Sequence, residues 1–249
     1  MQGFNPLSIV SKAFDSLALS LDPPPRRAQS PDEGKEAYIR WAITYYVYSV
    51  IAHIRTVLHG VIVLADSGNI PTAMVVTRHV FEWAAQVCYM NENLQKHVAA
   101  RDWDAALGLL NQAVIGSRFI REYGQKYDST QIKTDIPKAI RLGDALASYE
   151  AHVEKTFGGD TKEDYTHLSE HSHPTSLCLQ QYHDDIPGQP IRFREPTKGS
   201  PLPVVNWCLI DLCTLLLELL RLSSDNMVQP RLAATLTEIA RLASGKQRQ

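Results

Sequence analysis

The stretch from Pro71 to Asn91 (PTAMVVTRHVFEWAAQVCYMN) constrains the fold most, because it predicts a helix that is apolar on nearly every side. Proline suits the first helical position, since its missing N–H would be unpaired there in any case. The preceding residues Ser67, Gly68 and Asn69 are typical of a loop. A helix without a clean polar face is usually buried by neighbours on several sides. We therefore expect this helix to lie at the centre of a helical core.

Two charged residues on this helix, Arg78 and Glu82, lie one turn apart on an otherwise apolar face. A buried arginine and a buried carboxylate are costly unless they are paired or hydrogen-bonded. Arginine four residues before glutamate is the weaker order for a surface pair, which favours contacts with another helix. The pair is either a structural ion pair or one half of a binding or catalytic site.

The rest of the chain predicts an all-α fold. Apolar residues recur at helical spacing, and short polar segments separate the periodic stretches. Besides the central helix, with a short continuation at residues 92–100, we expect helices at residues 4–21, 33–65, 103–126, 137–157, 162–173, 204–223 and 229–243. Short connections favour antiparallel neighbours, so the prediction is an irregular antiparallel helical bundle of about seven or eight helices.

Two proline-rich segments interrupt the helical pattern. The run from Asp22 to Pro25 predicts a stiff connector, so residues 1–31 form an N-terminal helical arm and its connector. Residues 32–244 then form a single helical domain, and residues 245–249 form a frayed tail. The segment from Tyr182 to Pro203 predicts a long loop or a small hairpin before the C-terminal helices, and loops of this length often cover a site.

Composition and charge bear on several classes of function. The 249 residues carry a formal net charge of −2, which gives no basic footprint for nucleic acid. The four cysteines form no Cys-x-x-Cys pair, so we expect free thiols in a reducing cytoplasm. We expect no secretory signal at the N-terminus. The apolar runs at residues 42–64 and 204–222 contain charged residues and histidines, which favours core helices over membrane spans.

The most unusual stretch runs from Tyr165 to Pro174 (YTHLSEHSHP). His167, Glu170 and His171 match the His-x-x-Glu-His signature of inverted zinc peptidases. On a helical wheel, however, the two histidines lie among acidic residues on the side opposite the apolar face. We therefore expect no metal at this motif, and we expect no cofactor.

A second interpretation is a ribonuclease of the HEPN type, whose signature is an arginine followed several residues later by a histidine on the same helix. In this chain only three residues separate Arg55 from His59, and His79 follows Arg78 directly. The required spacing is missing, so the interpretation remains only as a distant similarity.

The third interpretation concerns the apolar face of the same stretch. Tyr165, Ser169 and His173 recur every fourth residue, so they lie in line along one face of the predicted helix. If this face meets Arg78 and Glu82, the five residues form a cluster with a carboxylate, an imidazole, an arginine and hydroxyl groups. We call these five residues the Arg78 cluster and predict them as the candidate catalytic residues.

The two motifs together resemble those of an uncharacterised family of mainly helical bacterial proteins. The shared features are the Arg-x3-Glu helix with Arg78 and Glu82, and the Tyr-x3-Ser-x3-His-Pro segment, followed by a loop or hairpin and a long helix. The resemblance covers residues 38–221. It implies an all-helical domain and makes the Arg78 cluster the best candidate site, while it implies no established activity or cofactor.

Two classes of function remain open. In the first, the chain is a bacterial binding or regulatory protein, in stress or phage defence, and the Arg78 cluster holds the core together or binds a small anionic ligand or a protein partner. In the second, the chain is a hydrolase, such as a HEPN-like ribonuclease, that uses the cluster for acid–base chemistry. The leucine-rich helix at residues 204–222 also predicts a surface for a homodimer.

Overall fold

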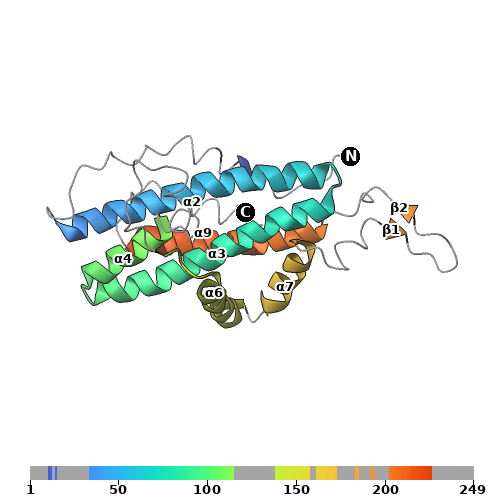
Figure 1. Ribbon diagram of the computed structural model, residues 1–249. Coiled ribbons are helices and arrows are strands. Elements are labelled where there is room, and N and C mark those ends of the chain that lie inside the picture. The colour runs from blue at the N-terminus through green and yellow to red at the C-terminus, as the bar shows by residue number, and fades with distance from the viewer. Residues whose placement is uncertain are drawn as a thin grey trace, which may run out of the picture.

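The computed structural model describes residues 11–12, 15, 34–114, 138–157, 161–172, 183–184, 192–193 and 202–225. This part of the chain is all-α, as predicted, with six helices and one pair of very short strands (Figure 1). The helices are α2 (Lys35–Asp66), α3 (Ile70–Ala99), α4 (Trp103–Val114), α6 (Leu142–Phe157), α7 (Thr161–Ser172) and α9 (Leu202–Asp225).

Helix α3 lies at the centre and packs against each of the other five described helices. In Figure 1, α2 and α9 run lengthwise beside it, while α6 and α7 meet it from below. Its buried residues include Met74, Phe81, Val87 and Leu94, and they fall on several sides of the helix. The predicted burial of this helix by neighbours on several sides is therefore confirmed.

The two ends of α3 follow from local chemistry. At the N-terminus, the side chain of Asn69 accepts a hydrogen bond from the backbone N–H of Thr72. At the C-terminus, Arg101 has a φ of 55°, and Asp102 donates its N–H to the carbonyl of His97, which closes a Schellman motif. No break occurs at Asn91, so the predicted central helix and its short continuation form one helix.

Other predicted boundaries can be compared with the described residues. Helix α6 begins at Leu142, later than the predicted start at residue 137, and the carbonyl of Arg141 accepts its first hydrogen bonds. The strands β1 (His183–Asp184) and β2 (Arg192–Phe193) pair in antiparallel fashion inside the segment predicted as a loop or small hairpin. The predicted helix at 229–243 and most of that at 4–21 lie outside the described residues.

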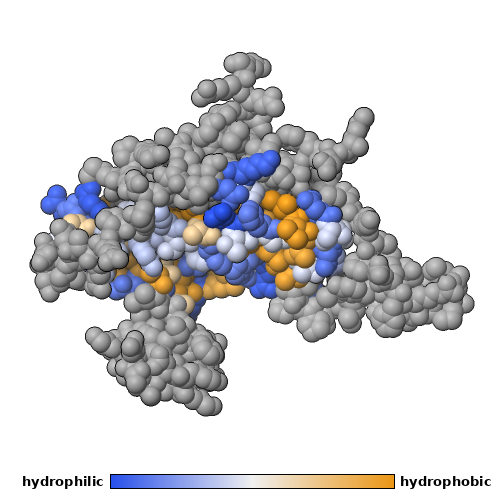
Figure 2. Space-filling view, turned by 90° about the horizontal axis from the view of Figure 1, so that it is seen from above, coloured by the Kyte–Doolittle hydropathy of each residue, from blue (hydrophilic) through white to orange (hydrophobic). Residues whose placement is uncertain are grey.

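Helix α2 is long and apolar enough to cross a membrane by length and composition alone. Core helices of soluble proteins meet the same criteria, and α2 packs against α3, α4 and α9. Figure 2, seen from the α2 side, shows hydrophilic and apolar side chains together on the described part of this face. The interpretation of α2 as a core helix stays a prediction.

A buried polar pair joins α6 to α9 within the core. The hydroxyl of Tyr149 donates to Oδ1 of Asp211 at 2.8 Å, and both residues are buried. Burial raises the pKa of Asp211 to about 8, although the hydrogen bond from Tyr149 opposes the shift. A carboxyl group that keeps its proton at neutral pH is less costly in such surroundings than a carboxylate.

The first prediction concerns this carboxyl group. An unfolded aspartate has a pKa of about 3.9. Between that value and the folded pKa of about 8, the unfolded state has lost the proton that the folded state retains. The contribution of Asp211 to stability is therefore complete at low pH and falls as the pH rises through this window, by up to ~1.4 kcal/mol per pH unit. Asp211→Asn should be stabilised relative to the original chain at pH 8, and much less at pH 5.

Melting temperatures of both proteins at the two pH values check this expectation. The exposed substitution Glu154→Gln on α6 is the control for loss of a carboxylate at the surface. If Asp211→Asn and the original chain show parallel pH profiles, the assignment of this stability change to Asp211 is wrong.

Candidate functional site

Arg78 on α3 makes hydrogen bonds within its own helix and to α7. Its Nε donates to Oε1 of Glu82 at 2.8 Å, and its Nη2 donates to the hydroxyl of Tyr165 at 2.9 Å. The Tyr165 hydroxyl in turn donates to the same Glu82 oxygen at 3.4 Å. The structure thus brings together three of the five residues of the predicted Arg78 cluster.

Aromatic rings enclose this contact. The guanidinium carbon of Arg78 lies 5.2 Å from the ring centroid of Tyr165, within the range of a cation–π interaction. The ring of Phe81 packs against Tyr165, with 5.3 Å between the ring centroids. The side chains of Arg78 and Glu82 retain 19% and 23% of their exposure, so solvent screening of their ion pair is reduced.

The charge state of Glu82 follows from its neighbours. Burial alone raises its pKa, but the nearby His79 ring and the charge of Arg78 outweigh burial, so the pKa lies below its ordinary value. Nδ1 of His79 lies 3.6 Å from Oε2 of Glu82. A general acid or base works best with a pKa near the working pH. The arrangement therefore suits an ion pair that holds α7 on α3 better than it suits proton transfer.

The structure describes only one of the other two residues of the cluster. Ser169 lies one turn after Tyr165 on α7, and its buried Oγ has no hydrogen-bond partner among the described residues. His173 lies outside the described residues, so its contact with Arg78 stays a prediction.

The residues of the HEPN alternative have another role. Nε of Arg55 donates to Asp15, and Nε2 of His59 lies 3.4 Å from the other oxygen of the same carboxylate. Asp15 belongs to the predicted N-terminal arm, so this part of the arm contacts α2 of its own chain. Arg55 and His59 are thus engaged with a carboxylate.

The His-x-x-Glu-His motif lies on α7. His167 and Glu170 line a shallow cavity of about 400 Å³ together with Lys162, Glu163 and Thr166. His167 is half-buried, although the helical wheel puts it on the side opposite the apolar face. The side chain of His171 lies outside the described residues, so the absence of metal at this motif stays a prediction.

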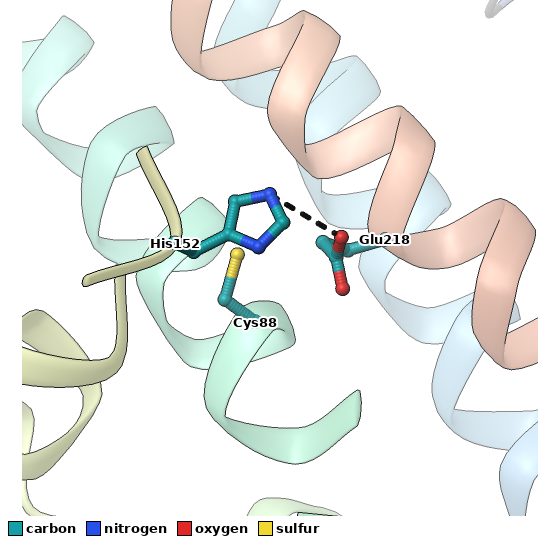
Figure 3. Close-up of side chains that lie close together, drawn as sticks. All are labelled: Cys88, His152 and Glu218. Atoms are coloured by element: carbon teal, nitrogen blue, oxygen red, sulfur yellow. Dashed lines mark ion pairs between the residues drawn. The ribbon is translucent and has the colours of Figure 1, made fainter. Parts of the chain in front are cut away.

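A second polar cluster was not predicted. Cys88 on α3, His152 on α6 and Glu218 on α9 converge at one point (Figure 3). Nε2 of His152 lies 3.5 Å from Oε1 of Glu218, which is almost fully buried. Asn91 donates its Nδ2 to Oε2 of Glu218 at 2.6 Å, and Arg221 donates to Oε1 at 2.6 Å. We call these five residues the Glu218 cluster.

The Glu218 cluster lines a cleft between α3, α6 and α9. The cleft has a volume of about 670 Å³ and is lined by Cys88, Asn91, Glu92, Gln95, Ser148, Ala151, His152, Lys155, Glu218 and Arg221. Burial raises the pKa of the Cys88 thiol, and the nearby charge of Glu218 adds to this shift. The buried wall of the cleft is thus polar, and its rim carries both acidic and basic side chains.

The sequence offered only a weak signal for this cluster. Its members come from three helices that lie far apart in the chain, and no motif links Cys88 to His152 or Glu218. The usable signal was a glutamate inside the leucine-rich helix α9, because a buried carboxylate needs partners.

The second prediction tests whether Arg78 is a structural residue. Arg78→Ala removes two hydrogen bonds and leaves Glu82 without its arginine, so we expect a loss of roughly 1–3 kcal/mol in the free energy of unfolding. Arg40→Ala is the matched control, because it breaks an exposed pair with Glu36 at the same spacing and should cost less than about 1 kcal/mol. Urea unfolding measures both values. A loss for Arg78→Ala no larger than that of Arg40→Ala contradicts the structural role.

Comparison of the chain with protein-family models, curated proteins and solved structures gives no match. The resemblance to a family of helical bacterial proteins therefore stays a prediction from the two motifs.

Proposed function

We propose that the protein is a helical binding or regulatory protein that holds a small polar ligand in the cleft between α3, α6 and α9. The observation that carries this proposal is the cleft itself, with Glu218 buried in its wall and charged side chains at its rim. Its volume of about 670 Å³ falls within the range that is usual for small-molecule sites.

The charges around the cleft define the class of ligand. Lys155 and Arg221 are exposed at the rim and provide positive charge for an anionic group. Glu92 and Ser148, which share a hydrogen bond of 2.8 Å, lie on the same lining and provide acceptors for a donor group. A small molecule with one anionic group and at least one hydrogen-bond donor fits this arrangement. The proposal thus keeps the predicted small anionic ligand and changes its site.

In this proposal the Arg78 cluster has a structural role. Arg78 and Tyr165 hold α7 against α3, and the lowered pKa of Glu82 favours a permanent ion pair. The alternative, a hydrolase or HEPN-like ribonuclease that uses this cluster, requires a role for His173 as an acid or base. A folded His173→Ala variant that loses a measured activity supports the alternative.

We also propose that the complete chain forms an irregular antiparallel bundle of about seven or eight helices. The six described helices support it, together with the helical periodicity predicted at residues 4–21 and 229–243. Cys88, Cys208 and Cys213 are free thiols, which fits the predicted reducing cytoplasm.

The third prediction tests the cleft as the ligand site. Ala151→Trp places a large side chain on the exposed lining of the cleft, and Ala147→Trp makes the same change one turn earlier on α6, outside the lining. A panel of small polar anions is screened for compounds that raise the melting temperature of the original chain. Ala151→Trp should abolish the increase caused by such a compound, whereas Ala147→Trp should retain it. Equal responses of the two variants contradict the cleft as the site.

The fourth prediction concerns the homodimer expected from the leucine-rich helix. We propose that α9 contributes to the interface through Ile210 and Leu217, which are 52% and 37% exposed and lie two turns apart on the same side. Leu217→Glu should weaken association, because it places a charge in an apolar contact. Analytical ultracentrifugation measures the mass, with Val63→Glu on α2 as the control. A monomeric original chain contradicts the proposed dimer.

A further inference from the structure

We propose that Cys88, His152 and Glu218 form a Zn²⁺ site in the wall of the cleft. Each residue offers one ligand atom, namely a thiol sulfur, a ring nitrogen and a carboxylate oxygen, and these atoms all lie within 4.8 Å of one another. Figure 3 shows the three side chains extending toward a common point from three different helices. A metal ion held by these three side chains is additional to the small polar ligand of the proposed function.

The ligand types favour zinc over other common ions. Sulfur and imidazole nitrogen are the ligands of Zn²⁺ and other late transition metals, whereas Mg²⁺ and Ca²⁺ require oxygen ligands. A cysteine, a histidine and an acidic residue together are compatible with tetrahedral zinc. Zinc also has no redox chemistry of its own, so the site needs no electron donor.

The distances are close to those of a bound ion. Two ligands at about 2.0–2.2 Å from one tetrahedral zinc ion lie roughly 3.4 Å apart. The separation of 3.5 Å between Nε2 of His152 and Oε1 of Glu218 already agrees with this value. The longest separation among the three ligand atoms is no more than 4.8 Å. Side-chain rotations that move these atoms by about 1 Å therefore bring them to tetrahedral zinc distances.

Neighbouring side chains orient the carboxylate ligand. Asn91 donates to Oε2 of Glu218, which directs the other oxygen, Oε1, toward His152. This hydrogen bond has the role of the outer contacts that fix ligands in known metal sites. The Oδ1 atom of Asn91 is buried and has no partner among the described residues, so the site contains a polar atom that a metal-bound water can satisfy.

Arg221 is the main competitor for the ion. It donates to Oε1 of Glu218, but its side chain is 54% exposed, whereas that of Glu218 is 3% exposed. Movement of such a long exposed side chain costs little, and a carboxylate oxygen has a second lone pair for the metal. Zinc therefore replaces Arg221 at Oε1 of Glu218 or shares that oxygen with it. The buried hydrogen bond from Asn91 to Oε2 stays in place.

The charge balance of the bound site is favourable. Coordination requires the thiolate of Cys88, so each Zn²⁺ that binds releases one thiol proton to solvent. The thiolate and the Glu218 carboxylate then neutralise the two positive charges of the ion, while His152 binds as a neutral imidazole. The fourth position faces the cleft, where water or an anionic group of the ligand can occupy it.

The fifth prediction is that the metal-free chain binds one equivalent of Zn²⁺ at this site. The probe is the metal alone, added to full-length protein in a non-chelating reductant after treatment with a chelator. Isothermal titration measures affinity and stoichiometry, and Co²⁺ replaces zinc to report a cobalt–thiolate charge-transfer band. We expect Cys88→Ala to abolish the band and to weaken zinc binding by at least about a hundredfold, more than is typical for loss of an outer-shell contact.

Cys213→Ala is the matched control, because Cys213 is a free thiol on α9 outside the cluster, and it should keep both the band and the affinity. Glu218→Gln preserves the shape of the side chain and its contact with Asn91, and it should weaken binding while the protein stays folded by circular dichroism. The inference is overturned if the original chain shows no cobalt–thiolate band, or if Cys88→Ala binds zinc with unchanged affinity. Neither result bears on the Ala151→Trp test, so failure of the zinc site and failure of the proposed ligand site are distinguishable.

Discussion

Burial of α3 on several sides is the constraint on which the rest of the structure depends. A polar side chain on such a helix cannot remain solvated, so a neighbouring helix must supply its partner. Arg78 meets Tyr165 of α7 near one end of α3, and Asn91 meets Glu218 of α9 near the other. The polar groups of α3 thereby select which helices pack against it and at which level, in addition to the apolar contacts.

The two polar clusters along α3 differ in a way that matters for function. In the Arg78 cluster, the arginine is engaged by Glu82 and Tyr165, so its hydrogen bonds contribute to the packing of α7. In the Glu218 cluster, a thiol and an imidazole lie beside the carboxylate at the wall of a cleft. Contacts that join two packed helices suit a structural role, whereas polar groups that line a cleft can bind a ligand or an ion.

Much of the local structure could be predicted because α-helices have a fixed period. The apolar pattern located α2, α3 and α9 to within a few residues, and the wheel placed Arg78 and Glu82 on the face that meets Tyr165. The continuation of α3 past Asn91 was predicted as a separate short piece, and the first true break is the left-handed conformation at Arg101. Hydrophobic periodicity identifies segments more securely than it identifies their ends.

The sequence by itself determined the all-α class, the central helix and the paired charges on it, because each depends on residues within a few turns of one another. Only the tertiary structure decided that Cys88, His152 and Glu218 meet. These residues belong to three helices, and their contact depends on how α3, α6 and α9 cross and rotate against each other. Side-chain packing sets those angles, and no spacing along the chain encodes them in a form that can be read directly.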